Sequence, residues 1–251
     1  MTASPLPYRL PAAGPELLGH PLGLPVPDWQ GAPFPPRRVL SGYYCRVEPL
    51  EVERHAESLW AAMQLPGAER NWAYVTYGPF ERFADYRDWL AGMAAQRDPQ
   101  FYVAVDVVSG EALGVASYLR IDPVNGAIEV GHLNFSPRMQ RSRAATEMMY
   151  LMMANAFALG YRRYEWKCNA LNQPSSRAAL RLGFQFEGVF RQARVDRGRN
   201  RDTAWYSILD GEWPALRAAF ETWLTPDNFD AAGRQRQALS TLTAQAREGL
   251  A

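Results

Sequence analysis

The pattern of hydrophobic and polar positions is clearest between residues 127 and 169. Residues 127–135 are an apolar run that a Ser-Pro pair ends, and a short polar, basic segment follows. Residues 144–159 are apolar on almost every side of a helix and end at a glycine, which is a favourable residue just after a helix. A further strand pattern covers residues 161–169. A strand, a long helix and a second strand together predict a parallel β-α-β crossover.

The segment between the first of these strands and the helix is a candidate anion-binding site. A tight loop that opens a helix leaves several backbone N–H groups without partners. These groups and the helix dipole together favour a phosphate or another anion. Arg141 and Arg143 add positive charge at the same place. If the protein carries out chemistry, we expect the reaction beside this corner.

The other periodic segments predict a mixed sheet with helices on its faces. Strands are predicted over residues 38–49, 101–108, 113–121, 184–194 and 203–209, and helices over residues 50–64, 81–96, 175–182 and 213–224. Short turns join the strands predicted over residues 101–108, 113–121 and 127–135. These three strands are therefore expected to form an antiparallel meander. The element order predicts a mixed α/β fold: a mostly antiparallel, twisted sheet of about seven strands, helices on both faces and one parallel crossover.

Composition divides the chain into three parts. Ten of the 19 prolines lie in the first 40 residues. Proline lacks an N–H donor and fixes φ, so residues 1–37 are predicted to be an extended arm, with a partly disordered tail as the alternative. Residues 38–225 hold the main domain, and residues 226–251 are predicted to be a helical C-terminal tail. Either terminal part could contact a second copy of the chain, which leaves a homodimer open.

Charge and residue types exclude several classes of protein. The formal net charge of +1 argues against nucleic acid or an anionic membrane as a partner. Cys45, Cys168 and the three histidines show no metal-ligand spacing, so no metal site is expected. The chain has no apolar run of about 18 residues and no charged-then-apolar signal pattern. We therefore expect a soluble, cytoplasmic protein.

Three motifs point to one family. Residues 136–147 read SPRMQRSRAATE, residues 172–175 read NQPS, and residues 182–188 read LGFQFEG. In this order they resemble the pyrophosphate loop, the Asn-x-x-Ser motif and the Leu-Gly-Phe…Glu-Gly close of the GNAT superfamily of acyl-CoA-dependent N-acetyltransferases. The similarity covers residues 40–210 and is greatest to the branch of ribosomal-protein N-terminal (alanine) acetyltransferases. It implies that residues 38–225 are an acetyltransferase domain whose co-substrate is acetyl-CoA.

The resemblance also implies which residues bind acetyl-CoA, with the crossover forming the CoA cleft. Backbone groups of Leu133, Asn134 and Phe135 would bind the pantetheine arm. Asn172 would bind the pantetheine or acetyl end, unless it only caps the following helix. The backbone of the helix start would bind the pyrophosphate through Gln140, Arg141, Ser142, Arg143, Ala144, Ala145 and Thr146.

Two positions depart from the family pattern. Arg143 stands where the family has a glycine, which lets the backbone approach a pyrophosphate closely. This arginine could close over the phosphates, reach the 3′-phosphate of CoA, or mark a lost cofactor site. The tyrosine that many members use to protonate the leaving thiolate is also missing, because Ala179 lies near its place. Ser175 is the substitute in some relatives, and water is the alternative.

Glu129 and His132 are the candidates for the general base. Some relatives place a catalytic glutamate in the strand of Glu129, which could act directly or through water; a glutamate paired across the sheet is the alternative. His132 is the second candidate, with a buried structural histidine as its alternative. Plain alternation would send the two side chains to opposite faces of the sheet, and a β-bulge between them would change that count.

The acceptor is expected to be a primary amine, on a small molecule or at the N-terminus of a peptide or protein. In this fold Trp72, Tyr74, Tyr77 and Phe80 would form one substrate wall; alternatively, they pack the two helices on the sheet. Five arginines between residues 191 and 201 either contact an acidic substrate or form a solvated hairpin face with Asp196 and Asp202. The alternatives to an enzyme are a non-catalytic acyl-CoA-binding or sensing module and an interaction protein.

Overall fold

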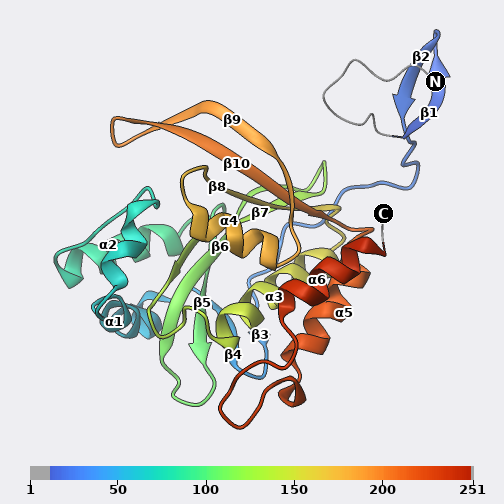
Figure 1. Cartoon of the computed structure of the whole chain (residues 1–251). Coiled ribbons are helices and arrows are strands. Elements are labelled where there is room, and N and C mark those ends of the chain that lie inside the picture. Colours follow the sequence, from blue (N-terminus) through green and yellow to red (C-terminus); the bar gives the residue numbers. More distant parts are fainter. Residues whose placement is uncertain (1–11, 250–251) are drawn as a thin grey trace. The chain divides into compact units, whose positions relative to one another are not determined.

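The computed structural model describes residues 12–249 and builds the main domain around one sheet (Figure 1). Among these residues, eight strands form that sheet. They are β3 (Leu40–Ser41), β4 (Cys45–Pro49), β5 (Gln100–Asp106), β6 (Ala112–Asp122), β7 (Ala127–Phe135), β8 (Arg163–Asn169), β9 (Gln185–Asp196) and β10 (Arg199–Leu209).

The strand order confirms the predicted fold class. The order across the sheet is β3-β4-β5-β6-β7-β8-β10-β9. Every neighbouring pair is antiparallel except β7 and β8, which are parallel. The sheet is therefore mixed and mostly antiparallel with one crossover, as the sequence pattern predicts, and it has eight strands rather than about seven.

The additional strand arises because the segment predicted as one strand over residues 38–49 is interrupted at residues 42–44. The buried carboxylate of Glu147 accepts hydrogen bonds from the backbone N–H groups of Tyr43 (2.7 Å), Tyr44 (2.7 Å) and Cys45 (2.8 Å). A Cβ at Gly42 would lie 2.3 Å from the Glu147 carboxyl carbon, so this turn requires glycine. One glutamate thus ends β3, begins β4 and ties both to the crossover helix.

Helices cover both faces of the sheet (Figure 1). Phe101 and Val103 of β5 belong to a buried cluster with the first two helices, whereas Tyr102 and Ala104 belong to a cluster with the crossover helix. This alternation follows from the period of two along a strand. The helices are α1 (Val52–Met63), η1 (Ala68–Ala73), α2 (Phe83–Ala94), α3 (Arg143–Ala158), α4 (Gln173–Arg181), α5 (Trp213–Leu224), η2 (Pro226–Asn228) and α6 (Leu239–Glu248).

Within its described residues, the segment predicted as a helical C-terminal tail holds the short 3-10 helix η2 and the helix α6, and α6 packs on the main domain. Leu239 is fully buried. Arg247 donates from Nε to the backbone oxygen of Gly183 (2.6 Å) and pairs with Glu212 (3.0 Å). These contacts join α6 to the turn after α4 and to the start of α5.

The proline-rich arm contains a small hairpin of its own. Contacts divide the chain into residues 1–30 and residues 31–251. Within the first unit, β1 (Ala13–Leu17) and β2 (His20–Gly23) pair antiparallel, and almost all of their side chains are exposed. Residues 1–11 of the predicted arm lie outside the described part of the chain.

No helix within residues 12–249 combines the length and the apolar character that a membrane span requires.

Candidate functional site

The parallel strands β7 and β8 separate halfway along their length, and this opening is the centre of the candidate site. Their ladder covers only residues 127–130 and residues 163–166. On its other side β7 carries a bulge: Ser117 of β6 pairs with Gly131, but Val115 pairs with Asn134. The extra residue bends β7 away from β8. His132, in the bulge, has a φ of 51°, a backbone conformation that side chains other than glycine rarely adopt.

Side chains from two loops hold the diverging end of β7. The Tyr77 hydroxyl donates to the backbone oxygen of His132 (3.3 Å). Asn71 donates to the backbone oxygen of Phe135 (2.8 Å), and Gln140 donates to that same oxygen (2.8 Å). The stretch expected to bind pantetheine is therefore fixed in its bent form. Asn71 is a site residue that the sequence pattern does not single out.

The loop expected to bind the pyrophosphate leads from β7 into the first turn of α3. The Ser142 side chain caps this helix by accepting from the backbone N–H of Ala145 (3.1 Å). The other N–H groups of the first turn have no partner inside the helix, as at every helix start. Arg141 is exposed with a φ of 59°, and the Thr146 hydroxyl accepts from Arg181 of α4 (3.2 Å). Positive charge and N–H donors thus meet at this corner.

Arg143 does not take the backbone conformation for which glycine is needed. It is the first residue of α3, and the positive φ of this loop falls at Arg141 instead. The Arg143 guanidinium carbon lies 5.0 Å from the ring centre of Tyr44 and 4.5 Å from that of Phe229. Such stacking on aromatic faces is favourable for a guanidinium. An arginine at position 143 is therefore compatible with the loop geometry, and its side chain has aromatic partners inside the protein.

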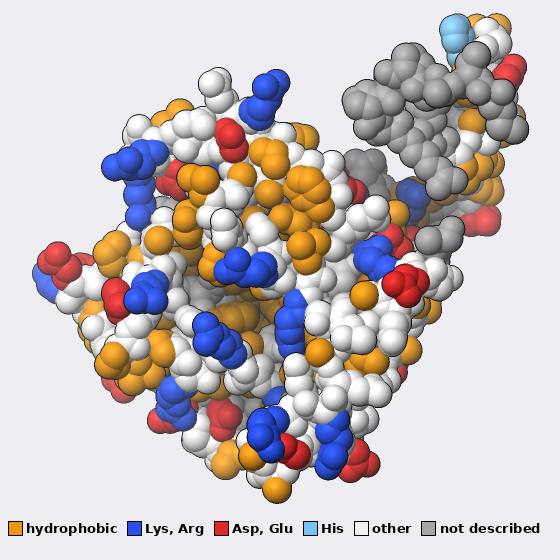
Figure 2. Space-filling model, in the orientation of Figure 1, with side chains coloured by type: hydrophobic (Ala, Val, Ile, Leu, Met, Phe, Trp, Pro, Cys, Tyr) orange, Lys and Arg blue, Asp and Glu red, His pale blue; other side chains and the backbone are white. Residues whose placement is uncertain are grey.

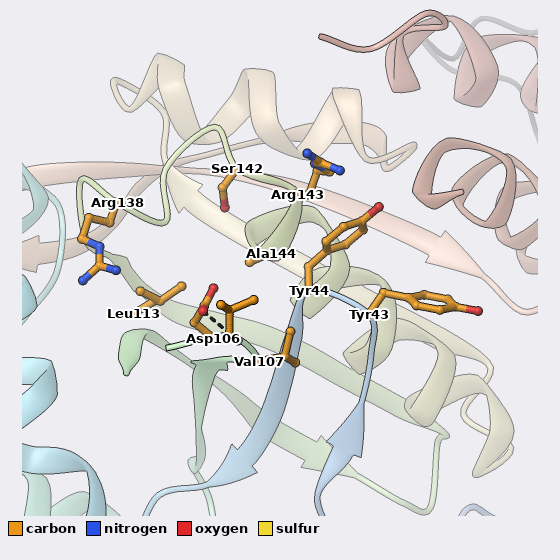
Figure 3. A pocket seen from close by; sticks show the side chains of 10 residues that line it. Tyr43, Tyr44, Asp106, Val107, Leu113, Arg138, Ser142, Arg143 and Ala144 are labelled. Carbon is orange, nitrogen blue, oxygen red and sulfur yellow. Dashed lines mark hydrogen bonds between the residues drawn. The ribbon is translucent and has the colours of Figure 1, made fainter. Parts of the chain in front are cut away.

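A pocket of about 320 Å³ opens beside the start of α3 (Figure 3). Arg138 and Arg143 lie on either side of it, and Asp106 lies between them. Burial alone would raise the pKa of Asp106, but hydrogen bonds from the backbone of Ser109 and Val108 lower it below its ordinary value. Ser142, Arg143 and Ala144 at the start of α3 also line this pocket, so the Asp106 carboxylate, which is ionised at neutral pH, lies beside the helix start.

Asn172 and Ser175 lie at the start of α4. The Asn172 side chain accepts from the backbone N–H of Ser175 (3.2 Å), so the capping bond considered as its alternative role is present. The Ser175 hydroxyl accepts from the indole N–H of Trp166 (3.0 Å). Trp166 is the last β8 residue paired with β7. Ser175 is therefore beside the point where the strands separate, on the face covered by α3.

Glu129 is buried in an ion network on the opposite face. Arg120 Nη1 lies 2.7 Å from both carboxylate oxygens of Glu129, and Lys167 Nζ lies 2.8 Å from one of them. Lys167 also pairs with Glu165 (2.7 Å) and lies 3.7 Å from the ring centre of Trp205. Lys167 is the only lysine of the chain. Its rarity is the signal that could have identified it from the sequence.

His132 shares that face with Glu129 because of the bulge. Its ring stacks on Phe101 (5.0 Å between centres), a residue of the cluster under α1 and α2. Its Nδ1 lies 2.7 Å from the Ser117 hydroxyl. Burial, followed by the positive charge of Arg120, lowers the pKa of His132 to about 4. The imidazole is therefore neutral at pH 7, and the two candidate bases lie on one face.

The lowered pKa of His132 predicts a loss of stability in mild acid. The unfolded chain binds a proton below the ordinary histidine pKa of 6.5, whereas the folded protein does so only near pH 4. Stability should therefore fall between these two values, by roughly 3 kcal/mol for this one group. Replacing His132 with glutamine should remove this part of the pH dependence. Urea unfolding of the wild type and the variant across this pH range gives the measurement. A difference in unfolding free energy between the two proteins that stays constant with pH would contradict the prediction.

Three of the four expected wall residues are packed in an aromatic cluster. Trp72 lies 5.8 Å from Phe80, and Tyr77 stacks on Trp89 of α2 (4.2 Å). The packing role considered as the alternative is thus present for these three residues. Tyr74 differs, because it is exposed and donates from its hydroxyl to the backbone oxygen of Leu171 (3.3 Å) in the loop after β8.

The β9–β10 hairpin is bound to the same aromatic loop. Arg197, at the hairpin turn, donates to the backbone oxygens of Val75 (2.6 Å) and of Tyr77 and Gly78 (3.3 Å each). Figure 1 shows the hairpin reaching across the sheet toward α2. Figure 2 shows a hollow below α4, with a partly hydrophobic floor and several Lys or Arg side chains on its rim. The hairpin and the aromatic loop are therefore linked beside the opening.

Comparison with known proteins gives consistent matches. Residues 46–185 match the family model described as Acetyltransferase (GNAT) domain. A solved structure titled GCN5-related N-acetyltransferase from Brucella melitensis is 44% identical, with a TM-score of 0.86, over 87% of this chain and 100% of that one. A probable acetyltransferase (GNAT family) from Chromobacterium violaceum ATCC 12472 is 41% identical, with a TM-score of 0.73, over 82% of this chain and 100% of that one.

One curated relative is itself named for a protein acceptor. The ribosomal-protein-serine acetyltransferase of Escherichia coli (strain K12) is 30% identical over 103 residues, which are 41% of this chain. The matched part spans 58% of that relative's length.

Proposed function

The chain belongs to the GNAT acetyltransferase family, and on that premise we propose that it transfers an acetyl group from acetyl-CoA to a primary amine. The observation that carries this proposal is the opening between β7 and β8, bounded at one end by the N–H groups of the α3 helix start. An extended pantetheine arm fits such an opening, and a pyrophosphate fits a helix start.

The residues that would hold acetyl-CoA lie along one path. Leu133, Asn134 and Phe135 would bind the pantetheine arm through their backbone, and Asn172 would bind near its acetyl end. The pyrophosphate would be bound by the backbone of residues 140–146. Acetyl-CoA supplies a thioester, whose acyl group is activated for attack by an amine. Our assignment is supported by the fixed, bent end of β7 and by the absence of strain at Arg143.

The two faces of the sheet suggest how protons move. Glu129 and His132 lie on the face covered by α1 and α2, whereas Ser175 lies on the face covered by α3. We assign the amine to the first face. The amine nitrogen bonds to the acetyl carbon, the carbon–sulfur bond breaks, Glu129 takes the proton lost by the amine, and Ser175 or water donates one to the thiolate. His132 is the alternative base.

We propose the N-terminus of a peptide or protein as the preferred acceptor, with a small-molecule amine as the alternative. The relative from Escherichia coli is named for a ribosomal protein, which supports a protein acceptor. Arg197 binds the aromatic loop, and Tyr74 binds the loop after β8. These links between loops beside the opening favour an acceptor whose amine lies at the end of a narrow chain, such as a peptide. Both cysteines are free thiols, which fits a protein of the reducing cytoplasm.

One observation favours a second function, that of an acyl-CoA-binding module without catalysis. Glu129 is engaged by two cations, Arg120 and Lys167, and these contacts occupy the oxygens that would accept a proton. Saturable binding of acetyl-CoA without any acyl transfer would support this alternative.

Release of CoA thiol across a panel of primary amines and peptides tests the proposal. We expect release that requires both acetyl-CoA and an amine, and faster release with peptide N-termini than with N-terminally blocked peptides of the same sequence. A protein that binds acetyl-CoA but turns over no member of the panel would contradict the proposed reaction.

A further inference from the structure

Two arginines lie directly opposite each other on the β9–β10 hairpin. Arg194 of β9 and Arg201 of β10 are register partners in an antiparallel pair. Direct partners place their side chains on the same face, and like charges at such positions are destabilising. Two positions closer to the turn, the pair Asp196 and Arg199 is complementary in charge. The arginine pair is therefore the exception on this hairpin.

Arg201 is not well neutralised by the protein. Only 12% of its side chain is exposed, and its carboxylate neighbour Asp196 lies at 3.9 Å, the long end of an ion pair. Its Nε is buried and has no hydrogen-bond partner among the described residues. Burial, followed by the charge of Arg194, lowers the pKa of Arg201. A buried donor without a partner is costly, so the folded protein retains an unfavourable group here.

The unpaired donors continue along β10. Residues 201, 203 and 205 alternate onto one face of this strand. The Thr203 hydroxyl and the indole N–H of Trp205 are also buried without a partner within the described part of the chain. The Trp205 ring packs under Lys167, which binds Glu129. The row of donors therefore leads from the arginine pair to the candidate base.

A second observation places the pair beside the reacting end of the site. Arg194 is among the charges that act on His132, together with Arg120 and Asp98. Arg120, which pairs with Glu129, is among the charges that act on Arg201. Both arginines are thus within electrostatic reach of the diverging ends of β7 and β8, on the face that we assign to the amine.

We propose that Arg194 and Arg201 bind a carboxylate of the acceptor, so that the preferred substrate carries a carboxylate close to its primary amine. This inference rests on the proposed acetyl transfer. Two guanidinium groups match a carboxylate in geometry and charge, and a bound anion would remove the repulsion between them. The carboxylate could belong to a free amino acid or to an acidic residue next to a peptide N-terminus, and the experiment separates these sources.

Matched acceptors test the proposal. One pair is an amino acid and its carboxamide; the other is a peptide with Asp as its second residue and the same peptide with Asn. In the wild type, kcat/KM for the carboxylate member of at least one pair should exceed that for the amide by about 10- to 100-fold. The pair that shows the preference identifies the source of the carboxylate. Equal rates within both pairs, with transfer intact, would overturn the subsite and leave the proposed reaction standing.

Variants connect the preference to the two arginines. Arg194→Gln and Arg201→Gln should bring the ratio within the preferred pair close to one, while Arg199→Gln, on the same hairpin, should leave it unchanged. Arg194 is exposed, so its variant is expected to fold. Because Arg194→Gln removes a like-charge contact, its unfolding free energy should not fall. An unchanged ratio in Arg194→Gln and Arg201→Gln would contradict the assignment.

Binding of the acetylated products separates this inference from the proposed reaction. Calorimetry with N-acetylalanine and N-acetylalaninamide, and with the two acetylated peptides, needs no turnover. Binding that requires the carboxylate and is lost in Arg194→Gln would support the subsite even if no amine is acetylated. Equal binding of the carboxylate and amide forms by the wild type would count against the subsite, whatever the result of the transfer assay.

Discussion

Replacing Glu129 with glutamine is expected to lower kcat/KM for acetyl transfer by about 100-fold, the size of a general-base contribution. The loss should be larger below the pKa of the acceptor amine than above it, because a neutral amine can attack without a base. Glutamine keeps the size of the side chain and removes its ability to take a proton. A pH–rate profile of both proteins with one acceptor gives the measurement.

Glu165→Gln is the matched control for this variant. Glu165 pairs with the same Lys167 but also with Arg163 (2.6 Å), and we assign it no part in the reaction. Its loss should therefore disturb the ion network without removing the base. Equal losses in the two variants, independent of pH, would show that Glu129 only supports the network, and His132 would then become the candidate base.

Replacing Glu147 with alanine is expected to lower the free energy of unfolding by roughly 3 kcal/mol or more. The variant leaves three backbone N–H groups without the acceptor that ends β3 and begins β4. It also removes the side chain that fills the space at Gly42. Urea unfolding followed by tryptophan fluorescence measures the change.

Glu221→Ala is a suitable comparison, since this exposed glutamate pairs with Arg217 one turn away (2.7 Å). Its removal should cost less than about 1 kcal/mol. A Glu147→Ala protein no less stable than the Glu221→Ala protein would show that the hydrogen bonds of Glu147 do not hold the first strands in place.

The sequence predicts the fold better than the contacts of the site. Local periodicity identifies the β7-α3-β8 crossover, because each of these elements is long and strongly patterned. The interruption at residues 42–44 depends on Glu147, a residue more than one hundred positions away. No local pattern could place it.

The shared face of Glu129 and His132 also depends on more than the local pattern. The bulge that brings them together is centred on His132, which has a positive φ although it is not a glycine. Arg120 and Lys167 reach Glu129 from the strands on either side. Sequence spacing identifies the candidate base but not its partners, since those are set by strand order.

Arg143 illustrates the opposite limit, where a motif suggests too much. A glycine in a family motif implies a backbone that needs a positive φ at that position. In this chain the positive φ falls at Arg141, two residues before Arg143. The aromatic partners of Arg143 are Tyr44 and Phe229, which lie outside the motif. The motif therefore locates the loop, whereas the structure decides what its arginine can do.

The central claim is that acetyl-CoA binds in the opening between β7 and β8 and on the loop that leads into α3. Hydrogen–deuterium exchange with and without CoA tests this claim most directly. We predict slower exchange at residues 133–135, 140–146 and 172–175 when CoA is present, and unchanged exchange in α6. Unchanged exchange in all three segments, or protection confined to another part of the chain, would contradict it.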